Sequence, residues 1–78
     1  MFEEIGKQQE ALDAYDKAIQ IKPDFVIAFN NKGLVQDAMG NHLEAIETYN
    51  KALTIKPDLD IAWFNKACAE ALLSNKEG

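Results

Sequence analysis

The side chains best suited to chemistry in this sequence are one histidine, one cysteine and several carboxylates. His42 is expected in a turn with Glu44 as its closest carboxylate, whereas structural zinc binds four ligands. Cys68 has no histidine partner on its own helix and no cluster of lysines beside it, so an activated thiolate lacks support. The simpler interpretations are a surface histidine and a small, partly buried hydrophobic cysteine. The other carboxylates recur as pairs on expected outward helix faces, at Glu3/Glu4, Asp13/Asp16 and Glu44/Glu47.

The sequence also lacks the glycine-rich loop that cradles phosphates in nucleotide-binding proteins. These observations together predict no catalytic residue, no metal site and no cofactor. We therefore expect a protein that is not an enzyme.

Composition narrows the range of partners. Thirteen acidic residues stand against eight lysines and no arginine, which leaves the chain acidic with a net charge of −5. Nucleic acid is therefore not expected as a partner, and an RNA-binding repeat is the least favoured interpretation, because phosphate backbones are bound by clustered Lys and Arg. The apolar runs are too short to cross a membrane, and the polar N-terminus does not resemble a secretory signal. A single cysteine suits a reducing compartment, so a cytoplasmic protein is expected.

An internal repeat is the strongest feature of the chain. A shift of 34 residues aligns residues 6–39 with residues 40–73, and fourteen of the 34 aligned pairs are identical. Apolar residues recur at helical spacing within each unit and predict helices near 9–21, 25–38, 43–55 and 59–73.

The predicted helix ends follow from local backbone chemistry. Both repeats carry Ile-Lys-Pro-Asp, at residues 21–24 and 55–58, and proline disfavours a helical conformation at the lysine before it. The aspartate of each motif is expected to cap the next helix. Gly40 is expected to end the second helix because glycine tolerates a left-handed conformation. Gly6 is expected to end a short helix over residues 2–5 in the same way.

The order of aromatic, small and proline residues resembles that of the tetratricopeptide repeat. The motif appears here as Phe29, Gly33, Gly40, Ala45, Tyr49, Ala52 and Pro57. The resemblance implies an all-α fold of antiparallel helix-turn-helix repeats of 34 residues, stacked as a short right-handed α-solenoid. Residues 1–23 would be the second half of a repeat, 24–57 a complete repeat and 58–78 the first helix of a further one. Gly33 and Ala45 are expected to face each other.

Departures from the family pattern are few. Lys32 and Lys66 replace a usual leucine, Gln36 and Glu70 replace a frequent tyrosine, and Ser74 replaces the glycine after the last helix, so that helix end is expected to be looser.

The resemblance further implies a concave face, lined by the first helix of each pair, that binds a protein or peptide. A grip on a C-terminal carboxylate is disfavoured, because the chain has no arginine to supply it. A groove for a partly apolar peptide or helix is expected instead, although a solvated face without a partner remains an alternative for each residue. The expected partner-binding residues are Asn30, Asn31, Leu34, Asp37, Phe64, Asn65, Cys68 and Leu72.

A second hypothesis rests on the half-repeats at the two ends. Apolar faces would stay open there, and the last helix of one copy with the first full helix of the next would rebuild one repeat. A homo-oligomer or a domain-swapped dimer is therefore expected, unless the chain is an excised part of a longer repeat protein. The residues expected at these self-association ends are Leu12, Ile19, Trp63, Ala67 and Leu73.

Overall fold

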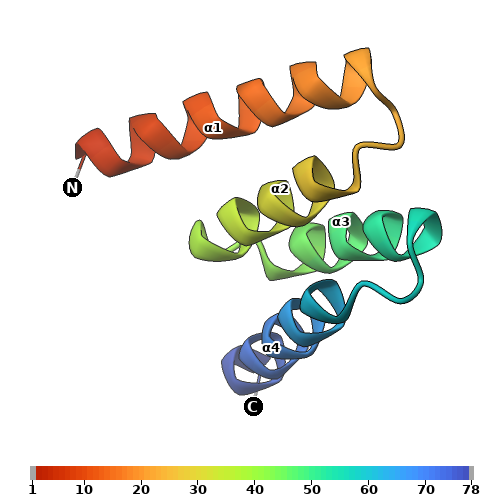
Figure 1. Ribbon diagram of the computed structural model, residues 1–78. Helices are drawn as coiled ribbons and strands as arrows, with labels where there is room; N and C mark the ends of the chain where they lie inside the picture. Colours follow the sequence, from red (N-terminus) through yellow and green to blue (C-terminus); the bar gives the residue numbers. More distant parts are fainter. Residues whose placement is uncertain (1, 78) are drawn as a thin grey trace.

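Four α-helices make up the part of the chain that the structure describes. This computed structural model describes the backbone of residues 2–77 and the side chains of residues 6–75. The helices are α1 (Phe2–Ile21), α2 (Val26–Ala38), α3 (His42–Ile55) and α4 (Asp60–Glu77). Figure 1 shows α2 and α3 as a central antiparallel pair, with α1 along one side of the pair and α4 along the other. The all-α, helical-repeat fold is thereby confirmed. None of these four helices combines the length and apolar character needed to cross a bilayer.

The two Lys-Pro-Asp connections have the same form. α1 ends at Ile21 and α3 at Ile55, as the prolines predict. Each connection is closed by a backbone bond, from the N–H of Phe25 to the carbonyl of Lys22 at 3.0 Å and from that of Leu59 to the carbonyl of Lys56 at 3.1 Å. The predicted cap by Asp24 is wrong, because this turn moves the cap position of α2 to Phe25, which has no side-chain cap bond.

The two glycines at equivalent repeat positions behave differently. Gly40 has a φ of 88° and ends the turn after α2, where the N–H of Asn41 donates to the carbonyl of Gln36 at 2.9 Å. This left-handed conformation favours glycine over residues with a Cβ. Gly6, in contrast, lies inside α1, so the predicted break after residue 5 is wrong. Glycine permits a left-handed turn but does not impose one.

The last helix also runs further than predicted. α4 continues through Ser74 to Glu77 rather than ending near residue 73. Serine carries a Cβ and adopts a left-handed conformation at a cost, so the backbone continues its helical hydrogen bonds.

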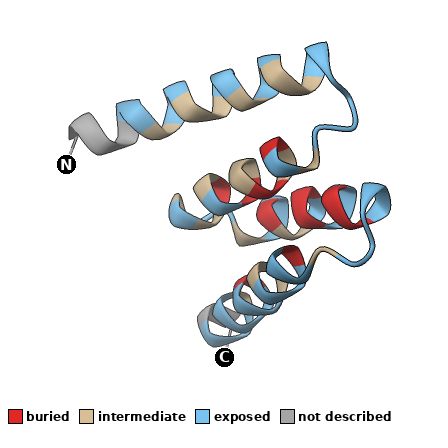
Figure 2. Ribbon diagram, viewed as in Figure 1, coloured by how far each residue is buried: buried red, intermediate tan, exposed pale blue. Residues whose placement is uncertain are grey.

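The core lies between α2, α3 and α4 (Figure 2). Tyr49 is fully buried and packs with Ala45 and Ala69, while a second cluster joins Ala52, Leu53 and Ala62. Gly33 lies against the ring of Tyr49, because a Cβ placed on Gly33 would meet three atoms of that ring first. The small residue therefore accommodates an aromatic ring between two helices.

Polar contacts also link neighbouring helices. Thr48 Oγ1 donates to Gln36 Oε1 at 2.5 Å between α3 and α2, and both side chains are buried. Asn65 Nδ2 donates to Asn30 Oδ1 at 3.1 Å between α4 and α2. Lys32 Nζ lies 2.7 Å from Asp16 Oδ1 between α2 and α1. A buried glutamine is stable at a position where an aromatic residue is common because the hydroxyl of Thr48 donates to its amide oxygen.

Candidate partner-binding surface

One stripe of α2 and one stripe of α4 stay uncovered by the other described helices. Residues 27, 31, 34 and 38 share one face of α2 because helical neighbours recur every three or four positions. The 34-residue repeat places residues 61, 65, 68 and 72 on the matching face of α4. The α2–α4 stripe is defined by these eight residues: Ile27, Asn31, Leu34, Ala38, Ile61, Asn65, Cys68 and Leu72.

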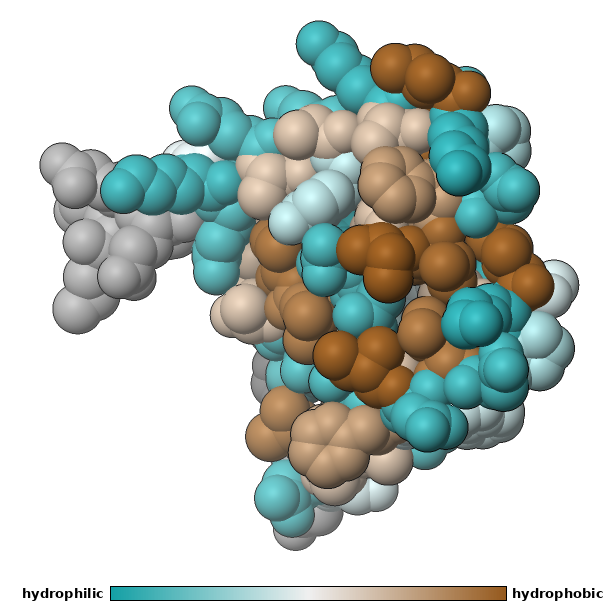
Figure 3. Space-filling model, in the orientation of Figure 1, coloured by the Kyte–Doolittle hydropathy of each residue, from teal (hydrophilic) through white to brown (hydrophobic). Residues whose placement is uncertain are grey.

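The apolar members of this stripe are unusually exposed. Leu34 has 41% and Leu72 has 45% of its surface exposed, and Cys68 is exposed as well. Sequence reasoning missed Ile27 and Ile61, which are also exposed and belong to the stripe. Their position one helical turn before Asn31 and Asn65 was the signal that could have identified them. Figure 3 shows apolar surface gathered near the middle of the face that it draws, with polar residues around it.

The asparagines of α2 and α4 divide into two roles. Asn30 is only 3% exposed and accepts the hydrogen bond from Asn65. It therefore joins the two helices and leaves almost no surface for a ligand. Asn31 is half-buried on the stripe, and Asn65 is half-buried with its amide oxygen not engaged by that bond.

Asp37 lies away from the stripe, in the last turn of α2. Its carboxylate accepts a hydrogen bond from the Nδ1–H of His42, and both side chains are largely buried. The expected neighbour of His42 was Glu44, so this pairing corrects that expectation. Because its carboxylate is hydrogen-bonded to His42, Asp37 stabilises the junction between α2 and α3.

Phe64 occupies the position in α4 that Asn30 occupies in α2. α4 covers Asn30, but none of the described helices covers Phe64, which is 67% exposed. Phe64 therefore lies beside the stripe, on the outer flank of α4.

Two family models match the chain. One, described as TPR repeat, matches residues 1–40, and one described as tetratricopeptide repeat matches residues 26–59. The chain belongs to the tetratricopeptide-repeat family. No curated protein matches it. Tetratricopeptide repeats generally serve as protein–protein interaction modules, which makes the exposed stripe of this repeat its first candidate binding surface.

The residues predicted at the self-association ends of this tetratricopeptide repeat differ in exposure. Trp63 is 51% exposed and Ala67 is exposed, on a different face of α4 from the stripe. Leu12 and Ile19 are half-buried along α1.

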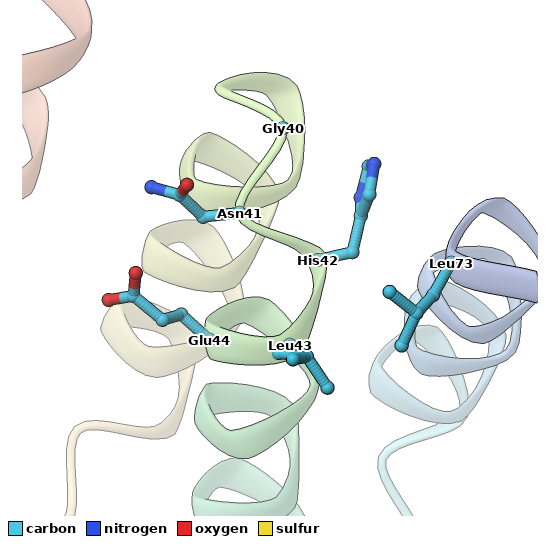
Figure 4. A pocket seen from close by; sticks show the side chains of 6 residues that line it. All are labelled: Gly40, Asn41, His42, Leu43, Glu44 and Leu73. Carbon is cyan, nitrogen blue, oxygen red and sulfur yellow. The ribbon is translucent and has the colours of Figure 1, made fainter. Parts of the chain in front are cut away.

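Leu73 is half-buried, on the side of α4 that lies toward α3. It points from α4 toward Leu43 and His42 at the start of α3 (Figure 4) and lines a hollow of about 400 Å³ with residues 40–44. The side chains of Asn41 and Glu44 point away from Leu73. Since polar groups do not converge in the hollow, it is a weak candidate for a small-molecule site.

The reactive side chains of the tetratricopeptide repeat remain dispersed. Among the residues that the structure describes, no group of three or more His, Cys, Asp and Glu side chains could hold a metal ion. Cys68 is exposed, which corrects its expected role as a partly buried hydrophobe and makes it part of the stripe.

Proposed function

We propose that the α2–α4 stripe binds a partly apolar peptide segment or helix of another protein. The observation that carries this proposal is the exposure of aliphatic side chains on two adjacent helices in matching repeat positions. Ile27 and Leu34 lie on α2, and Ile61 and Leu72 lie on α4. Exposed apolar residues grouped in this way favour a binding surface over a solvated face.

Asn31 and Asn65 supply the polar part of the surface. An amide side chain both donates and accepts hydrogen bonds, so it suits the backbone of an extended peptide or the end of a helix. The bond between Asn65 and Asn30 fixes the spacing of α4 on α2, which reduces the ordering that binding requires.

The same surface argues against other functions. It carries no cluster of cations for phosphate or carboxylate, and the chain is acidic overall. We therefore propose a non-catalytic interaction module that acts without a cofactor, in a reducing compartment such as the cytoplasm. Nucleic acid and membranes are not proposed as partners.

A phage-displayed library of random peptides tests the proposal. Peptides selected on the protein are expected to carry aliphatic or aromatic side chains, and their affinity can be measured by fluorescence anisotropy. Leu34→Glu or Leu72→Glu should weaken binding roughly tenfold or more, since loss of a central contact costs about 2 kcal/mol or more and about 1.4 kcal/mol is a factor of ten. Leu43→Glu is the matched control, because Leu43 is 65% exposed and lies outside the stripe. Unchanged affinity in both stripe variants would contradict the proposal.

A second candidate function is self-assembly, either through the exposed edge of α4 and the uncovered side of α1 or by exchange of helices in a domain-swapped dimer. The exposure of Trp63 favours this candidate, because large aromatic side chains are usually buried in folds or interfaces. Light scattering that shows a stable monomer at high micromolar concentration would contradict it.

A further inference from the structure

We draw no further inference here: the strongest candidate, the exposed thiol of Cys68 on the α2–α4 stripe, belongs to the surface already described, and no second feature among the described residues assigns it a ligand.

Discussion

Gly33 of α2 lies directly against the ring of Tyr49 of α3. A Cβ on Gly33 would come within 2.9 Å of three ring atoms, and Tyr49 is fully buried. The ring therefore occupies the space that a Cβ at residue 33 would need.

Gly33→Ala is expected to destabilise the fold despite the better helix propensity of alanine. Overpacking costs about 1–3 kcal/mol, while alanine recovers about 1 kcal/mol in a helix interior. Chemical denaturation should show a net loss in the free energy of unfolding. Gly6→Ala is the matched control, because nothing lies within 4 Å of its Cβ position inside α1, and it should be neutral or stabilising. Equal effects of the two substitutions would contradict the packing explanation.

Gly40→Ala should destabilise the chain for a different reason. The Cβ position of Gly40 is open, but its φ of 88° costs an L-residue about 1–2 kcal/mol. Gly40→Asn should recover part of that loss, since asparagine tolerates this conformation better. The midpoint of thermal unfolding, followed by circular dichroism, measures both variants. Equal stability of the alanine and asparagine variants would argue against backbone strain as the cause.

Asn65→Ala should weaken the attachment of α4 to α2. It leaves the buried Oδ1 of Asn30 without its donor, which costs about 1–3 kcal/mol. Hydrogen exchange should become faster in α4, and the free energy of unfolding should fall. Asn50→Ala is the control because Asn50 is exposed on α3. A loss no larger than that of the control would show that the bond between Asn65 and Asn30 contributes little.

The fold should lose stability at alkaline pH through Tyr49. Burial raises the pKa of Tyr49 from 10.0 to about 12, and the charges of Asp37 and Cys68 add to the shift. The folded state therefore keeps a proton that the unfolded state releases, so this contribution is complete below about pH 10 and is lost as the pH rises to about 12.

Tyr49→Phe should remove this part of the alkaline loss. Among the described residues the Tyr49 hydroxyl has no hydrogen-bond partner, so at neutral pH the variant should be as stable as the native chain or more stable. Thermal unfolding at several pH values measures the difference, with the half-buried Tyr15→Phe as control. A parallel pH dependence of Tyr49→Phe and the native chain would show that another group causes the loss.

Local chemistry explains which parts of the fold and site were predictable. Ile21 and Ile55 end their helices as expected because proline restricts the residue before it, whatever surrounds it. The resemblance to the family implied that Leu34 of α2 and Leu72 of α4 share one surface, and both are exposed. Helical spacing could not predict that Asn30 is buried and Asn31 is not, because the burial of Asn30 depends on α4, which approaches from 35 residues further along the chain.

The sequence by itself determined the 34-residue repeat, the helical character of each segment and the two proline-terminated connections, since these follow from backbone restrictions and residue spacing. Tertiary structure decided which glycine turns and which equivalent residue is buried. Gly40 turns where α2 packs on α3, whereas Gly6 continues a helix. Gln36 is buried and Glu70 is exposed for the same reason. A side chain leaves water only where a neighbouring helix supplies the surface and the hydrogen-bond partner that replace it.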